Sequence, residues 1–217
     1  MNVEQARFNM IEQQIRPWNV LDATVLELLA VVKREDFVPP AHRSLAFMDV
    51  EIPLGGGRRM LVPRVEARLL QDLNAQRHEK VLEIGAGAGF LSAMLGHRAQ
   101  RVISLESDPA LARQAAENLK RAGVLNVTVR EGEGAKGLAA EAPFDAILLS
   151  GSVAEVPSAL LAQLKVGGRL VGIVGEEPVM RAVKIVRTSE TEYSTTELFD
   201  TVAARLAGFA ELSAFAF

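Results

Sequence analysis

Apolar runs that end in glycine or polar residues recur along the middle of the chain, in segments 80–87, 101–108, 126–134, 144–151 and 169–176. Helical patterns lie between them. The segment 108–123 has Asp108 as an N-cap, Pro109 at its first helical position and Gly123 at its end, and residues 157–168 predict another helix. Strands that alternate with helices in this way form parallel sheets covered on both faces. We therefore predict a doubly wound α/β fold.

The two ends of the chain follow other patterns. Residues 5–38 have apolar positions at helical spacing and predict a helical cap beside the sheet. Residues 180–206 have β-branched residues on both sides of a polar middle, so we expect two antiparallel strands added to one edge of the sheet. The apolar stripes of the predicted cap consist of Phe8, Ile11 and Ile15, and of Val25, Leu28, Leu29 and Val32.

The length and charge of the chain limit its organisation and its partners. A chain of 217 residues is long enough to bury one continuous core. We expect a single domain, in which residues 1–62 form the cap and a loop, 63–178 the core and 179–217 the edge strands. The net charge of −3 and the pI near 5.7 disfavour nucleic acid, because proteins that bind it usually carry a basic excess.

The absence of cysteine excludes disulfides, thiolate catalysis and thiolate metal sites. The N-terminal residues have no apolar core of the kind that a signal peptide needs, and no later run is long enough to span a membrane. The three histidines, His42, His78 and His97, lack the spacing of metal ligands. We therefore expect a cytoplasmic protein without a metal site or a membrane partner, and a monomer.

Three glycines at one strand end mark the candidate binding site. Gly85, Gly87 and Gly89 follow the apolar run and precede a helix, where missing side chains let a ligand lie against the backbone. A tight structural turn is the alternative interpretation. The spacing G-x-G-x-G differs from the dinucleotide fingerprint G-x-G-x-x-G, because Phe90 follows the last glycine. Glu106, at the next strand end, is placed to accept hydrogen bonds from both hydroxyls of a ribose.

An acid directly before the glycines, Glu83, makes this segment resemble the first motif of the class I S-adenosylmethionine-dependent methyltransferases. Their ligand has an ammonium and a sulfonium, and an acid is of the right sign to favour a cation nearby. Ser150 and Ser152 stand at the carboxyl end of a later strand, where they contact a ligand or form a turn. A dinucleotide-dependent dehydrogenase is the rival on fold grounds.

The resemblance extends over most of the chain. The segments VVKREDFVPP, MDVEIPLGGG, VLEIGAGAGF, EGEGAKGL and APFDAILLSGSVAEVPSALLAQLKVGGRLVGIVGE resemble the protein-L-isoaspartate O-methyltransferases in order and spacing. The resemblance implies a Rossmann-like, mostly parallel sheet and a cytoplasmic O-methyltransferase that repairs proteins by methylating isoaspartyl carboxylates. S-adenosylmethionine is the implied cofactor. The implied cofactor-binding residues are Glu83, Gly85, Ala86, Gly87, Gly89, Glu106, Ser107, Gly132, Glu133 and Ser150.

The loop that the resemblance places on the acceptor side departs from the family pattern. Arg59 stands where the family has a threonine, and Leu61 stands where it has a serine. Loss of that hydroxyl removes about 0.5–1.5 kcal/mol of hydrogen bonding, and more toward a charged partner. Alternatively, Arg58 or Arg59 binds the acceptor carboxylate through two parallel hydrogen bonds. A purely structural interpretation is a surface turn whose arginines are solvated. Asp49 matches a family aspartate upstream of this loop.

Three hypotheses follow from the residues and the resemblance. The first is methylation of isoaspartyl sites in proteins or peptides. The second is a methyltransferase of the same descent with another acceptor, which Arg58, Arg59 and Leu61 favour. The third is a module that binds S-adenosylmethionine with little catalysis.

Overall fold

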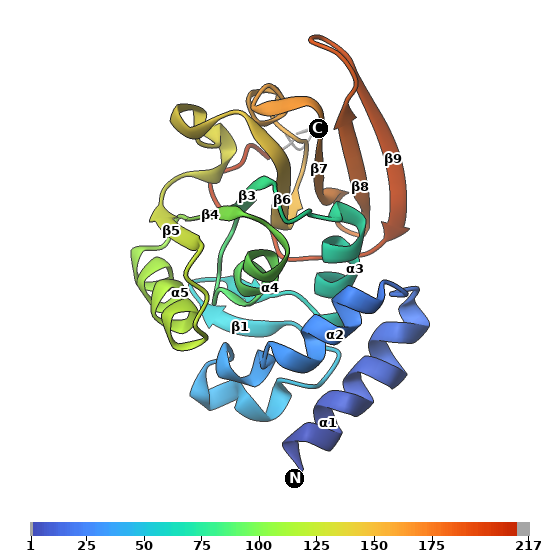
Figure 1. The fold of residues 1–217 in the computed structure, drawn as a ribbon, viewed down its shortest axis with the longest axis vertical. Coiled ribbons are helices and arrows are strands. Elements are labelled where there is room, and N and C mark those ends of the chain that lie inside the picture. Colours follow the sequence, from blue (N-terminus) through green and yellow to red (C-terminus); the bar gives the residue numbers. More distant parts are fainter. Residues whose placement is uncertain (1, 212–217) are drawn as a thin grey trace, which may run out of the picture.

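The computed structural model describes residues 2–211 of the chain. Its strands are β1 (Ile52–Gly55), β2 (Arg58–Met60), β3 (Lys80–Ile84), β4 (Arg101–Glu106), β5 (Val127–Glu131), β6 (Phe144–Val153), β7 (Leu164–Glu176), β8 (Val179–Arg187) and β9 (Tyr193–Asp200). Strands β1 and β2 form an antiparallel hairpin, and the other strands form one sheet of order β5-β4-β3-β6-β7-β8-β9. The pairs from β5 to β7 are parallel, and the pairs β7-β8 and β8-β9 are antiparallel (Figure 1). This topology confirms the doubly wound sheet with antiparallel edge strands.

Helices cover the two faces of this sheet unequally. The α-helices are α1 (Val3–Met10), α2 (Ala23–Val31), α3 (Pro63–Leu73), α4 (Phe90–Arg98), α5 (Pro109–Arg121) and α6 (Ser158–Leu161). On one face, α3 packs on β6, β7 and β8, α4 packs on β4 and β5, and α2 lies against α3 and α4. The opposite face carries the short α6 and the 3-10 turns that follow β5. Asp108 caps α5 as predicted, because its side chain accepts the first N–H groups of that helix.

Alternating side chains in the central strands explain why both faces are covered. Val81 and Val102 belong to the apolar cluster beneath α3, α4 and α5. Their neighbours Leu82 and Ile103 point to the other face, where they pack with Leu160 of α6. Strands with apolar side chains on both faces need packing elements on both sides of the sheet. The continuous apolar runs in the sequence therefore account for the helices and turns on both faces.

Two predictions of local structure are wrong. Residues 157–168 were expected to be one helix, but α6 ends at Leu161 and β7 begins at Leu164, because Leu164 already pairs with β6. Phe8 does not belong to the buried stripe of the cap: it is 58% exposed, because α1 lies at the periphery of the molecule (Figure 1). Ile11 and Ile15 of the same stripe are buried.

None of the helices within residues 2–211 is long and apolar enough to cross a membrane. For the C-terminal residues 210–217, the sequence alone leaves open whether they pack as an edge strand or cover the site. Residues 212–217 of that segment lie outside the described part of the chain.

Candidate active site

The loop from β3 to α4 turns sharply at its three glycines. Gly85, Gly87 and Gly89 have φ angles of +92°, +52° and +88°, which side-chain-bearing residues rarely adopt. The backbone N–H groups of Gly85 and Ala86 donate to the carbonyl of Leu105 in β4, at 2.9 and 3.1 Å. Within the described residues, α4 begins without a side-chain cap. Its first N–H groups are therefore available to an anionic group of a ligand.

Glu83, the last residue but one of β3, is fully buried and bonded to three hydroxyls. Ser104 and Ser150 donate to its carboxylate at 2.7 and 2.9 Å, and Ser92 donates to it as well. Burial raises the pKa of Glu83, and the three serine hydroxyls oppose this shift without cancelling it. The carboxylate thereby ties β3, β4, β6 and α4 together directly under the glycine loop.

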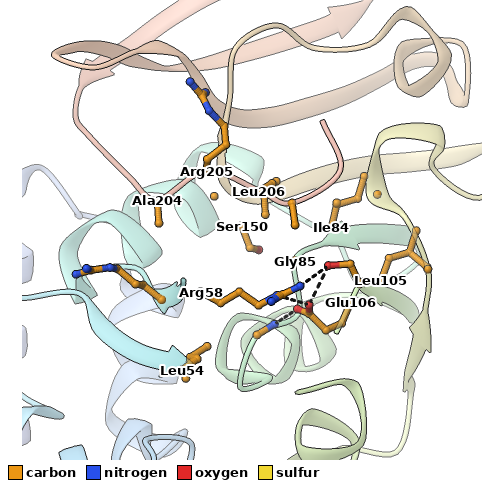
Figure 2. Close-up of a pocket in the computed structure, with 17 residues that line it drawn as sticks. Leu54, Arg58, Ile84, Gly85, Leu105, Glu106, Ser150, Ala204, Arg205 and Leu206 are labelled. Atoms are coloured by element: carbon orange, nitrogen blue, oxygen red, sulfur yellow. Dashed lines mark hydrogen bonds and ion pairs between the residues drawn. The ribbon is translucent and has the colours of Figure 1, made fainter. Parts of the chain in front are cut away.

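Glu106 ends β4 beside the same loop and is also buried. Its Oε2 accepts the N–H of Gly87 at 2.9 Å, and its Oε1 accepts the N–H of Asp108 at 3.0 Å. Arg58 of β2 reaches across the cavity to this carboxylate, with Nε 3.4 Å from Oε1 (Figure 2). The same guanidinium donates to the hydroxyl of Ser107 at 3.2 Å. Arg58, which was predicted to bind the acceptor, is therefore ion-paired with Glu106, which was predicted to bind the ribose.

Two adjoining cavities share the glycine loop. We call the larger the main cavity: it lies at the carboxyl ends of β3, β4 and β6 (Figure 2). The smaller, the inner cavity, lies between that loop and the β1-β2 hairpin, and its lining includes Leu61, Glu66 and Phe90. Predicted residues that line the main cavity are Arg58, Arg59, Gly85, Gly87, Glu106, Ser107, Gly132 and Ser150. Predicted residues that line the inner cavity include Leu61, Glu83 and Ala86.

Three predicted site residues lie outside both cavities. Asp49 forms an ion pair with Arg64 at the start of α3. Gly89 faces α5, where an added Cβ would lie 3.2 Å from the carbonyl oxygen of Ala115. The side chain of Glu133 is 71% exposed and lies 3.6 Å from Lys136. Gly89 and Glu133 thus adjoin residues that line the cavities without lining them themselves, and Asp49 lies apart from the other candidates.

A buried guanidinium contacts the segment that follows the β1-β2 hairpin. Arg34, which is 1% exposed, pairs with Glu66 of α3 at 2.9 Å and donates to the carbonyls of Ala46 and Leu61 at 2.8 Å each. Burial raises the pKa of Glu66 to about 6, although Arg34 opposes the shift. Leu61, which the resemblance places where the family has a serine, is thus fixed through its backbone carbonyl, while its side chain lines the inner cavity.

The C-terminal segment after β9 forms a wall that the sequence did not predict. Ser152 donates its N–H to the carbonyl of Ala204 at 2.9 Å, and its own carbonyl accepts the N–H of Leu206 at 2.8 Å. The hydroxyl of Ser152 is buried against the carbonyl of Ala203, so this serine anchors the segment. Leu206 and Arg205 consequently line the main cavity (Figure 2). The sequence of residues 203–206 has no apolar periodicity, so it gave no indication that this segment would line the main cavity.

Within residues 2–211, no group of three or more histidine, aspartate or glutamate side chains is placed to hold a metal ion.

Comparison with known proteins gives a consistent result in sequence. Residues 5–205 match the sequence profile of the family described as protein-L-isoaspartate(D-aspartate) O-methyltransferase. Protein-L-isoaspartate O-methyltransferase 1 of Syntrophobacter fumaroxidans is 39% identical over 185 residues, which are 85% of this chain and 86% of that protein. Protein-L-isoaspartate O-methyltransferase of Methanoculleus marisnigri is 39% identical over 181 residues, 83% of this chain and 82% of that protein.

A solved structure shares the fold. It is a putative protein-L-isoaspartate O-methyltransferase from Plasmodium falciparum, in complex with S-adenosyl-L-homocysteine. It aligns with a TM-score of 0.79 over 95% of this chain and 98% of its own, at 19% sequence identity. At that identity the likeness concerns the fold.

Proposed function

Because the chain belongs to the protein-L-isoaspartate O-methyltransferase family, we propose that it transfers a methyl group from S-adenosylmethionine to the carboxylate of an isoaspartyl residue in a protein or peptide. One observation of the structure supports this most: the glycine loop, Glu83 and Glu106 meet at the carboxyl ends of β3 and β4, beside the two cavities. Ligands of open α/β sheets bind at this edge.

The residues around the two cavities fit a nucleoside that bears an amino acid. Glu106 uses two acceptor positions for backbone N–H groups and keeps others for ribose hydroxyls. Ile84 and Leu105 provide the apolar wall that a base requires. The uncapped start of α4 suits a carboxylate, and the buried Glu83 suits an ammonium. This set of groups has the charges and the apolar surface that S-adenosylmethionine needs.

The chain contributes position rather than proton transfer to this reaction. When bound, S-adenosylmethionine supplies an electrophilic methyl group on a sulfonium. An acceptor carboxylate is already ionised at neutral pH, since its reference pKa is about 4, so no general base is needed. Holding the carboxylate oxygen in line with the methyl group and excluding water supply roughly 7–11 kcal/mol. The hairpin residues Arg58, Arg59 and Leu61 line the cavities where that oxygen has to be placed.

A second candidate function is methylation of a different acceptor by the same machinery. Leu61 is 3% exposed and presents an apolar side chain to the inner cavity where the family pattern has a hydroxyl. The neighbouring Glu66 also lines that cavity, with its charge paired to Arg34. An apolar side chain in place of a hydroxyl favours an acceptor less polar than an isoaspartyl carboxylate.

The test is a methyl-transfer assay with labelled S-adenosylmethionine and two peptides that differ only in containing isoaspartate or aspartate. Isoaspartate-dependent formation of base-labile methyl ester supports the first candidate. Ester or amide methylation of other acceptors alone supports the second, and binding without turnover supports a module with little catalysis. Glu106→Gln is expected to abolish most turnover. Its control is Glu131→Gln, since Glu131 is the exposed residue that pairs with Glu106 in the next strand.

The surroundings of the protein expected from its sequence stay predictions. They are a cytoplasmic location, a monomeric state, and the absence of nucleic-acid and membrane partners. The finer identification of the partner as an isoaspartyl protein or peptide belongs to the proposal above.

A further inference from the structure

Arg58 lies where the cofactor has to bind. Its guanidinium is 3.4 Å from Glu106, 3.5 Å from Asp108 and 3.2 Å from the hydroxyl of Ser107. Figure 2 shows this side chain extended from the hairpin across the main cavity to Glu106. Arg58 thus links the β1-β2 hairpin to Glu106, the acid that we assign to ribose binding.

The carboxylate of Glu106 cannot serve both partners fully. A carboxylate offers about four lone-pair positions. Three are taken: Oε2 accepts the N–H of Gly87, and Oε1 accepts the N–H of Asp108 and, at 3.5 Å, the hydroxyl of Ser107. The guanidinium of Arg58 is ion-paired to the same Oε1 at 3.4 Å, on the side from which ribose hydroxyls have to approach. Arg58 and the nucleoside therefore compete for one acid.

A displaced Arg58 keeps few alternatives among the described residues. Asp108 is the other carboxylate beside it: Oδ1 accepts two N–H groups of α5, and Oδ2 lies 3.5 Å from Arg58 on a side chain that is 31% exposed at the rim, where water competes for it. The nearest cation on the same strand, Arg59, already lies 3.8 Å from Glu51 and is half exposed. A guanidinium released from Glu106 at this mouth is a bidentate donor suited to an incoming carboxylate.

We propose that Arg58 exchanges partners during the reaction cycle: entry of the nucleoside displaces it from Glu106, and the released guanidinium binds the acceptor carboxylate. This rests on the proposed function for the nature of the acceptor. Cofactor binding then creates the acceptor's anion site, so the acceptor binds after the cofactor. The coupling is reciprocal, because each ligand raises the affinity for the other by the same factor.

The test measures binding of S-adenosylhomocysteine by calorimetry, and binding of an isoaspartyl peptide by fluorescence anisotropy with and without saturating S-adenosylhomocysteine. In the wild type, we expect S-adenosylhomocysteine to tighten peptide binding about fivefold or more. In Arg58→Gln, S-adenosylhomocysteine should bind about twofold to fivefold more tightly, because its competitor is gone. The tightening of peptide binding should disappear in this variant.

Two further variants make the result specific. Arg58→Lys keeps the positive charge but lacks the two parallel N–H donors of the guanidinium. It should retain part of the coupling between cofactor binding and peptide binding. Arg181→Gln removes a cation that pairs with Glu197 and Asp200 in the edge strands and lines neither cavity, and it should keep the coupling. Weaker binding of S-adenosylhomocysteine by Arg58→Gln, or undiminished coupling in that variant, overturns the proposal.

Failure of the proposed function is visible separately. If the wild type neither binds nor methylates the isoaspartyl peptide, the proposed function fails, and the acceptor half of this inference is overturned with it. Tighter binding of S-adenosylhomocysteine by Arg58→Gln would still support the displacement of Arg58 from Glu106.

Discussion

The glycine loop and the β1-β2 hairpin line the same two cavities, but different interactions hold them. Backbone hydrogen bonds to β4 fix the glycine loop, together with a carboxylate that is bonded to two serines of the central sheet and one serine of α4. The hairpin belongs to a separate two-stranded sheet, and its fixed points are side chains from distant parts of the chain: Arg34 behind it and Glu106 in front. Sheet topology therefore fixes the loop, whereas the hairpin is held by Ile52 and Met60 in the apolar core and by a few side-chain contacts from distant parts of the chain.

The largest effect is expected from removing the charge behind the hairpin. Arg34→Met leaves Glu66 as an unpaired buried carboxylate and frees two backbone carbonyls. We expect a loss of about 3–5 kcal/mol in the free energy of unfolding, measured by urea denaturation. The double variant Arg34→Met with Glu66→Leu should recover part of this loss, because no unpaired charge is left. A loss below about 1 kcal/mol in the single variant would contradict the dependence of the hairpin on this pair.

On the loop side, Glu83→Ala should reduce affinity for S-adenosylhomocysteine about 100-fold, or roughly 3 kcal/mol. The change leaves the hydroxyls of Ser92, Ser104 and Ser150 without their shared acceptor, and hydrogen bonds to a charged group contribute about 1.5–3 kcal/mol each. Calorimetric titration gives the affinity. Ser104→Ala is the milder companion, since it removes one buried donor and should weaken binding less. Equal affinity in Glu83→Ala and the wild type would show that the loop keeps its shape without this carboxylate.

The free energy of unfolding should depend on pH through Glu66, the buried acid that pairs with Arg34. Glu66 has its pKa raised from 4.5 to about 6, so the folded state holds this proton more tightly than the unfolded state. That contribution to stability is full below about pH 4.5 and is lost as the pH rises to about 6, a change of about 2 kcal/mol. Urea denaturation across this range should show it as the difference between the wild type and Glu66→Gln. The difference cancels Glu83, which both proteins share, and a flat difference would contradict the assignment to Glu66.

The smallest effect concerns the acceptor itself. Leu61→Ser introduces the hydroxyl of the family pattern into the inner cavity. One hydrogen bond to a carboxylate should raise isoaspartyl turnover up to about tenfold, or about 1.4 kcal/mol. Leu61→Ala is the matched control, because it opens a similar space without the hydroxyl. Equal rates in the two variants would show that this position does not face the acceptor.

The predictions from sequence succeeded where local pattern and sheet topology agree. Apolar runs and helix caps led to the doubly wound sheet, and the carboxyl ends of β3 and β4 bring Gly85, Gly87 and Glu106 together as topology requires. They failed where another element decides the outcome. The helix expected at 157–168 gave way to pairing of β7 with β6, and Ser152 anchors the C-terminal segment instead of facing a cavity. The roles of the site residues stay predictions.

The order of most strands and helices, the glycine turn and the acids at two strand ends were predictable from the residues alone, because these features follow from interactions between residues near each other in the chain. The three-dimensional fold was needed to place Arg58 beside Glu106, 48 positions away, Arg34 against the carbonyl of Leu61, and residues 204–207 along the main cavity. Such contacts join side chains whose separation in sequence contains no periodic signal. Their geometry exists only once the sheet has placed its neighbours.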